Sequence, residues 1–223
     1  MLAFIYIDNI KTMRSIFAFL LLLICNSIIA QNNWELQKDE DNIKVYTRNA
    51  EGYSLKASKV TSVLETTIPR LVAVLMDADN FYKVIPTSKS SELLKIINDS
   101  ERIYYIITDA PWPVTDRDGI YKMTFSQNPT SKVVSVNVVN LPDYIPKKDD
   151  HVRVPASEGL WKFTPLSHGK VEVFYQYVAD PGGSIPAWLA NSSAVSIPFE
   201  TIQNLKKRVT LEQYDGQTFS FLK

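Results

Sequence analysis

The sequence predicts an α+β fold, in which an antiparallel sheet packs against one long C-terminal helix. Two observations lead to this class. Segments of alternating polar and apolar residues follow one another across short turns, as consecutive antiparallel strands do. Apolar residues then recur every three or four positions from Leu189 to Val209, which is the period of an amphipathic helix. No internal repeat or linker divides the chain, so one domain is expected.

Residues 1–30 have the pattern of a secretory signal peptide. Arg14 precedes an apolar run over residues 16–25, and a small residue, Ala30, ends the segment. The run is shorter than the roughly 20 apolar residues that a membrane span needs. We therefore expect an exported protein, periplasmic or secreted; the alternative is a lipoprotein anchored to the membrane through Cys25.

Cleavage after Ala30 leaves residues 31–223 as the expected domain, whether translation starts at Met1 or at Met13. The chain has 24 basic and 24 acidic residues, and this balance argues against a nucleic-acid binder, whose surface must be basic. The balance is compatible with transient contact with a membrane. The one cysteine, Cys25, lies before the expected cleavage point, so the mature domain must be stabilised by its core without disulfides.

The expected strands form two groups around a short helical region. The turn-prone pair Asp41–Asn42 predicts a hairpin at the start. Thr66 or Thr67 is the expected cap of a helix with Pro69 in its first turn, and residues 79–86 continue as a short helix or turn. Two strands are expected within residues 34–48, and the others at 54–64, 93–97, 102–108, 119–126, 132–139, 159–164 and 171–178, with an irregular loop at 141–155.

The C-terminal helix follows a sharp turn, Asp180-Pro-Gly-Gly. The two glycines accept positive φ without strain. Ser184 is the expected N-cap, and Pro186 is expected in the first helical turn, where its missing N–H costs nothing. Pro198 removes an intrahelical hydrogen bond and favours a kink.

The order of these sequence motifs resembles the order found in a known family. The strings Asp180-Pro-Gly-Gly, Ile185-Pro-Ala-Trp-Leu-Ala-Asn and Pro198-Phe are similar to the C-terminal helix of START domains, the steroidogenic-acute-regulatory-related lipid-transfer family, and most of all to its phosphatidylcholine-transfer members. The motif Pro111-Trp-Pro-Val-Thr-Asp-Arg-Asp also resembles a motif that the family has between two strands. The resemblance covers roughly residues 34–208. It implies the helix-grip (START/Bet v 1-like) fold, a curved antiparallel sheet around the C-terminal helix, which closes a hydrophobic tunnel.

Strand alternation indicates which aromatic residues are candidates for the tunnel wall. In the last strand, Tyr175 shares a face with Val173 and Tyr177, whereas Phe174 takes the other face. Ordinary core packing is an equally good interpretation for each of them. The candidate ligand-binding residues, on the cavity wall and the lid helix, are Arg117, Asp118, Trp161, Phe163, Tyr175, Tyr177, Trp188, Leu189, Val195, Phe199 and Ile202.

The neighbours Asp116, Arg117 and Asp118 place a guanidinium between two carboxylates. This cluster either orients a polar headgroup or pins the crossing loop, and we favour the loop role. Because an unpaired buried arginine is costly, we expect Arg117 to have a carboxylate partner. Phosphatidylcholine-binding relatives use an Arg and an Asp one turn apart after the first long helix. The matching segment here has Asp79 and Lys83 in the reverse polarity, so choline recognition is not implied.

Catalytic patterns are nearly absent. Residues 31–223 hold two histidines, both in expected loops, and no cysteine, so neither a zinc site nor a cysteine nucleophile is expected. We predict a monomeric, non-catalytic protein without cofactor or metal, which binds, and can transfer, a lipid or other hydrophobic small molecule in a cavity closed by the C-terminal helix. One alternative is an enzyme like the cyclases and aromatases of this fold, acting on an apolar substrate. Another is a partner-binding module with a filled core.

Overall fold

A mainly antiparallel sheet of ten strands is the centre of the fold in the computed structural model, which describes residues 33–223. Residues 36–223 form one compact unit. The signal-peptide prediction falls on residues 1–30 and lies outside the described residues. The strands are β1 (Glu35–Glu40), β2 (Ile43–Arg48), β3 (Ala57–Glu65), β4 (Ser88–Asn98), β5 (Glu101–Thr108), β6 (Arg117–Gln127), β7 (Val134–Asn140), β8 (Val152–Arg153), β9 (Ala156–Pro165) and β10 (Lys170–Asp180).

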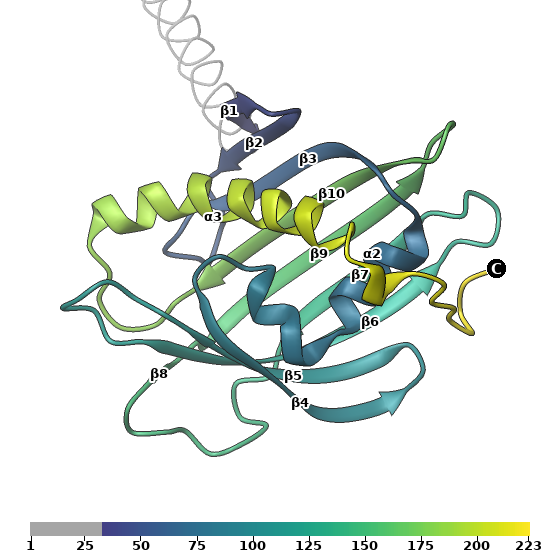
Figure 1. Ribbon diagram of the computed structural model, residues 1–223. Helices are drawn as coiled ribbons and strands as arrows, with labels where there is room; N and C mark the ends of the chain where they lie inside the picture. The colour runs from purple at the N-terminus through teal and green to yellow at the C-terminus, as the bar shows by residue number, and fades with distance from the viewer. Residues whose placement is uncertain (1–32) are drawn as a thin grey trace, which may run out of the picture. The chain divides into compact units, whose positions relative to one another are not determined.

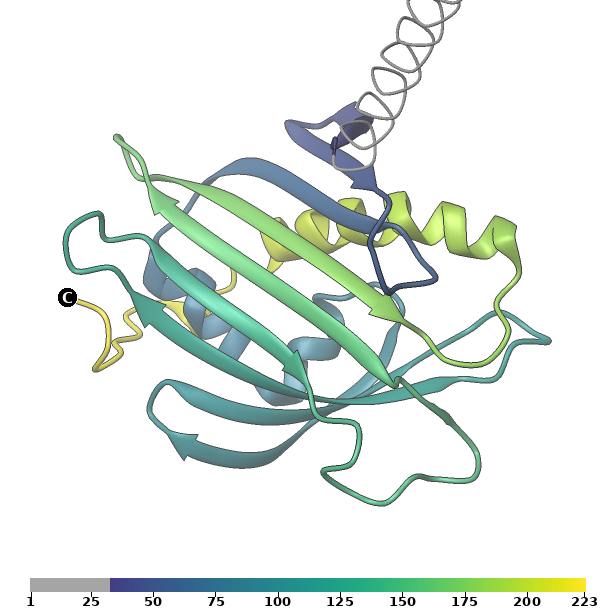
Figure 2. The same cartoon turned by 180° about the vertical axis from the view of Figure 1, so that it is seen from behind.

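The strand order is β1-β2-β3-β10-β9-β7-β6-β5-β4, with the short β8 parallel to the start of β6. The last strand therefore returns beside the third and joins the two groups of strands into one sheet. The helices α2 (Ile68–Met76) and α3 (Ala187–Arg208) and the 3₁₀ turn η1 (Ala78–Lys83) lie on one face of this sheet (Figure 1). In the view from behind, the sheet lies in front of them (Figure 2). This arrangement confirms the predicted α+β class and helix-grip fold.

Two local predictions are confirmed by the backbone. Asp41 and Asn42 both have positive φ, 53° and 63°, as the turn of a tight hairpin requires. Thr67 caps α2, because its hydroxyl accepts a hydrogen bond from the backbone N–H of Arg70 at 3.4 Å, and Pro69 lies in the first turn. The helix then buries a continuous apolar run, residues 71–76, against the sheet.

The start of α3 differs from the prediction. Pro186 has an extended backbone (φ −57°, ψ 137°) and takes the N-cap position, so the helix begins at Ala187. The carbonyl group of Pro186 accepts hydrogen bonds from the backbone N–H groups of Leu189 and Ala190 at 3.0 and 3.1 Å. The predicted side-chain cap at Ser184 is therefore wrong, since the chain is still extended two residues later. The second half of α3 is the better buried, with Phe199, Ile202, Leu205 and the C-cap residue Val209 in the main core.

The loop predicted at residues 141–155 contains a short strand that the sequence did not indicate. In β8, the N–H of Val152 donates to the carbonyl of Asp116, and beyond it the N–H of Val154 donates to the carbonyl of Asp118, both at 2.9 Å. A strand of two residues is too short to show alternation. Gly182, with φ 67°, packs closely on β8, because a Cβ atom there would lie 3.2 Å from side chains of Val152 and Pro155.

Candidate ligand cavity

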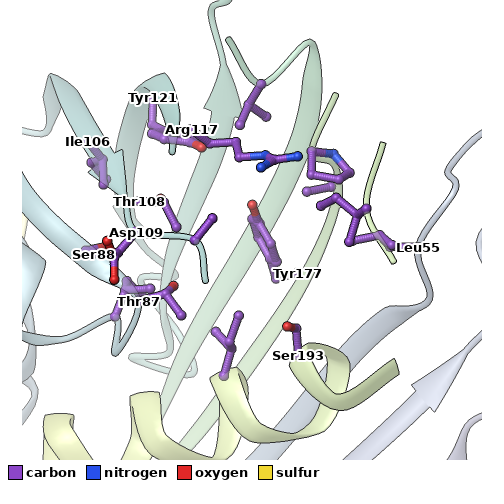
Figure 3. A pocket seen from close by; sticks show the side chains of 18 of the residues that line it. Leu55, Thr87, Ser88, Ile106, Thr108, Asp109, Arg117, Tyr121, Tyr177 and Ser193 are labelled. Atoms are coloured by element: carbon purple, nitrogen blue, oxygen red, sulfur yellow. The ribbon is translucent and has the colours of Figure 1, made fainter. Parts of the chain in front are cut away.

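An apolar cavity of about 230 Å³ lies between the inner face of the sheet and the first turns of α3. Its lining comes from β5, β6, β9 and β10, from η1 and the residues after it, from the β5–β6 loop, and from the hinge before α3. Figure 3 shows side chains of the sheet and of α3 facing each other across this space. The charged residues among the described lining are Arg117 and Asp109; the others are apolar or neutral.

Three aromatic side chains of β9 and β10 form a stacked wall of the cavity. The strand register places Trp161 opposite Tyr175, and their rings stack at 3.9 Å between centroids with 16° between planes. Tyr177 continues the row, with its ring 6.3 Å from that of Tyr175. Burial raises the pKa of both tyrosines, so their phenols stay neutral at physiological pH. All three predicted residues line the cavity.

Two glycines leave space for aromatic side chains of the cavity wall, Gly159 for Tyr177 and Gly119 for Tyr121 on β6. A Cβ atom at Gly119 would lie 2.3 Å from the hydroxyl oxygen of Tyr121, so the tyrosine side chain occupies the space over this glycine. A Cβ atom at Gly159 would lie 3.6 Å from the ring of Tyr177 and 3.3 Å from the Cβ of Val138. Tyr121 also lines the cavity, and burial raises its pKa, with the nearby Tyr177 phenol as the second cause.

The predicted lid residues fall into three environments. Leu189 lines the cavity, together with Ala190, Ser193 and Ile197 of the same helix. Phe199 and Ile202 are 5% and 0% exposed and belong to the core, against which the half-buried Val195 also packs. Trp188 is 66% exposed. Phe163 of β9 is likewise a core residue and does not reach the cavity.

Arg117, the first residue of β6, lines the cavity and is 6% exposed. Its guanidinium donates to backbone carbonyl groups, from Nη1 to that of Thr115 and from Nη2 to that of Gly182 at 3.2 Å. In residues 33–223 no carboxylate lies within 4.0 Å of it, so the predicted carboxylate partner is wrong. Its neighbour Asp116 pairs with Lys89 at 2.7 Å instead.

Asp118 lies on the opposite face of the sheet from Arg117. Successive side chains of a strand point to opposite faces, and Arg117 begins the inward series that Tyr121 and Met123 continue. Asp118 instead accepts hydrogen bonds from Arg153 at 2.9 and 2.8 Å and from the Tyr105 hydroxyl at 3.0 Å, all on the outer side. Its prediction as a cavity residue therefore does not hold. No pattern in the sequence indicated Arg153 as the partner of Asp118, because Arg153 lies in the two-residue strand β8.

The segment from Asp79 to Lys83 does not present charge to the cavity. Asp79 and Lys83 are both exposed on η1, and the Lys83 ammonium donates to the side-chain oxygen of Asn80 at 2.8 Å. Phe81 between them points inward and lines the cavity. Sequence reasoning missed Phe81 as a cavity residue, since a 3₁₀ helix of six residues is too short to show a clear periodicity.

The described residues hold no cluster of three or more metal-ligating side chains. His168 is an exposed turn residue with φ 59°, and the His151 ring pairs with the Asp150 carboxylate at 2.7 Å. Within residues 33–223, no helix has the length and apolarity to cross a membrane.

The sheet, the gripped helix and the apolar cavity between them define a helix-grip protein. The chain belongs to the START domain family, whose model matches residues 24–214.

Similar proteins support this assignment. A STAR-related lipid transfer protein from Xanthomonas axonopodis has a solved structure with 39% identity and a TM-score of 0.74, and the match covers 81% of this chain and all of that one. An uncharacterized protein of Pseudomonas aeruginosa is 35% identical over 78% of this chain and 85% of its own length. Phosphatidylcholine transfer protein of Rattus norvegicus is 28% identical over 73% of this chain and 77% of its own length.

Proposed function

We propose that the protein binds one lipid or other hydrophobic small molecule in this cavity, without chemical change, and exchanges it with a membrane. The observation that supports the proposal is the apolar cavity, which is lined mainly by apolar and neutral aromatic residues and bordered by the first turns of α3. Each methylene removed from water contributes about 0.8 kcal/mol, so a chain of about 14 carbons gains roughly 11 kcal/mol before the cost of ordering. The relatives named as lipid transfer proteins support the same class of ligand.

The cavity is small for such a ligand. Its volume of about 230 Å³ is below the roughly 300–1,000 Å³ of typical ligand pockets. The wall must therefore move on binding. We propose that the N-terminal half of α3 is the moving part, because its cavity-facing residues Leu189 and Ile197 are half-buried, whereas the second half is fixed in the core. The glycines at 182 and 183, with φ 67° and 62°, are the hinge.

Two exposed tryptophans flank the cavity and support transient membrane contact. Trp112 is 93% exposed and follows the lining residue Pro111 in the β5–β6 loop. Trp188 precedes the lining residue Leu189 at the start of α3. Tryptophan is favoured at membrane interfaces because its ring is apolar and its N–H stays hydrated. A lipid would then leave the bilayer between these two segments.

The test is binding by purified protein, with a matched pair of blocking variants. Mass spectrometry of organic extracts should detect a co-purified lipid, and titration with single-chain amphiphiles should give saturable binding of one molecule. Ser193→Trp, which fills the cavity from α3, should abolish binding, whereas Ser192→Trp on the exposed side of the same helix should not. Chemical conversion of the bound ligand, or equal binding by both variants, would contradict the proposal.

A further inference from the structure

The guanidinium of Arg117 is a buried cation in the wall of an otherwise apolar cavity. Its residue is 6% exposed, two of its N–H groups donate to carbonyl groups, and its buried Nε has no acceptor. An arginine has five N–H donors and stays charged in proteins, so this side chain has unused donors and a full positive charge. Neutral carbonyl groups solvate that charge only in part.

The other charges around it are already compensated. Asp109, the second charged lining residue, is exposed and pairs with Lys89 at 3.2 Å. Asp116 accepts from the same ammonium at 2.7 Å and from the backbone N–H of Ala110 at 3.1 Å. Burial lowers the pKa of Arg117, and Asp116 opposes that change only as the smaller cause. Among residues 33–223, the cation therefore has no close counterion.

The geometry suits a molecule with one charged end. Arg117 and Met123 both line the cavity on β6, and six residues of a strand span about 20 Å. The side chain of Arg117 extends over one side of the pocket, and the Tyr177 hydroxyl points to that side (Figure 3). The space between Arg117 and Met123 is bounded by Tyr121, Tyr175 and Trp161, which offer apolar surface.

We propose that Arg117 binds the anionic head of the ligand, a carboxylate or a phosphate, so that the cavity selects an anionic amphiphile. This inference rests on the proposed function, because it names the chemical class of the molecule carried. The carboxylate or phosphate replaces the missing counterion, and the Tyr177 hydroxyl is a second donor. The chain of the amphiphile lies along β6 toward Met123.

The experiment compares dodecanoate, dodecyl phosphate and dodecanol, which share one chain and differ in the head, by calorimetric titration. Hydrogen bonds to charged groups predict that the two anions bind about 10–100-fold more tightly than the alcohol. In Arg117→Gln the preference should disappear, because the two anions lose much more affinity than dodecanol does. Arg102→Gln is the matched control, since its guanidinium also donates to a backbone carbonyl, that of Met76 at 3.0 Å, but lies outside the cavity.

The outcomes distinguish a failure of the Arg117 proposal from a failure of the proposed lipid-binding function. The role of Arg117 is contradicted if all three amphiphiles bind with equal affinity, or if the preference for anions survives in Arg117→Gln. Neither result contradicts the proposed lipid binding. If none of the three amphiphiles binds, the proposed lipid-binding function is contradicted as well. Inorganic phosphate that binds as tightly as dodecyl phosphate would show a free-anion site and overturn the lipid assignment. If Arg117→Gln does not fold, Arg117→Lys, which keeps the charge without the planar fork, should weaken dodecyl phosphate more than dodecanol, and an unchanged ratio contradicts the proposal.

Discussion

Arg153 and Asp118 form a two-point ion pair across β8 and β6, with Nε to Oδ1 at 2.9 Å and Nη2 to Oδ2 at 2.8 Å. Their side chains are 2% and 0% exposed. Arg153 also donates to the carbonyl groups of Pro142, Ile145 and Pro146. Arg153 therefore holds the long β7–β9 connection on the sheet, whereas Arg117 donates to the β5–β6 loop at Thr115 and to the hinge before α3 at Gly182.

Removing one partner of this pair should lower the free energy of unfolding strongly. Arg153→Met leaves the Asp118 carboxylate buried without its cation, which typically costs about 3–5 kcal/mol. Urea denaturation of the folded domain measures the difference. The double variant Arg153→Met with Asp118→Leu should lose less than the two single losses added together. Additive losses would show that the two side chains act independently.

The same pair predicts a dependence of stability on pH. Burial by itself would raise the pKa of Asp118, but hydrogen bonds from Arg153 and Tyr105 hold it below its usual value. A carboxyl group whose pKa is lower in the folded state stabilises the protein above its unfolded pKa of about 3.9, and the contribution is lost as the pH falls through the folded value. The stability gap between wild type and Asp118→Asn should therefore narrow below about pH 4. A gap that is constant down to pH 2 would contradict this account.

Fixing α3 to the sheet should slow lipid exchange. The hydroxyl of Ser58 on β3 donates to the carbonyl of Ala194 on α3 at 2.6 Å, so the two positions are adjacent. A disulfide between Ser58→Cys and Ala194→Cys should reduce transfer between vesicles by at least about 10-fold, because opening requires α3 to leave β3. Reductant should restore the rate. Transfer at the same speed in the oxidised form would place the entry elsewhere, for example under the loop at residues 141–155.

The two exposed tryptophans should anchor the protein on membranes. Trp112→Ala and Trp188→Ala should each weaken binding to phospholipid vesicles, on the order of 10-fold, because a large aromatic surface is lost from the contact. Co-sedimentation with vesicles gives the partition. Leu166→Ala is a suitable control, since Leu166 is 43% exposed but lies in the β9–β10 turn, away from the cavity lining. If all three variants bind alike, membrane contact uses another surface.

We propose that the protein is exported, on the strength of the segment from Arg14 to Ala30. Intact-mass analysis of the protein from its native host should show a chain that begins at Gln31. A mass that retains residues 16–30, or one that carries an acyl group on Cys25, would contradict cleavage and favour an anchored form.

Local signals in the sequence were sufficient for most of the elements and for the α+β class, whereas the helix-grip fold was implied by the resemblance to START domains. The positive-φ turn at Asp41–Asn42, the Thr67 cap and the alternation of Tyr175 with its neighbours depend on residues close in the chain, and each is confirmed. The period of α3 was likewise readable, although its first residue was not, because Pro186 proved to be extended.

Partners that are distant in the chain were decided by the tertiary structure. Alternation along β6 implies that Arg117 and Asp118 face opposite sides, but only the packing of β8 shows that Arg153 pairs with Asp118. Likewise, only the fold brings Phe81, Ser193 and Arg117 to one cavity, and among residues 33–223 it places no carboxylate within 4.0 Å of Arg117. The sequence by itself determined which side chains share a face. Which of these faces enclose the cavity depends on contacts between residues far apart in the chain, and these carry no local pattern.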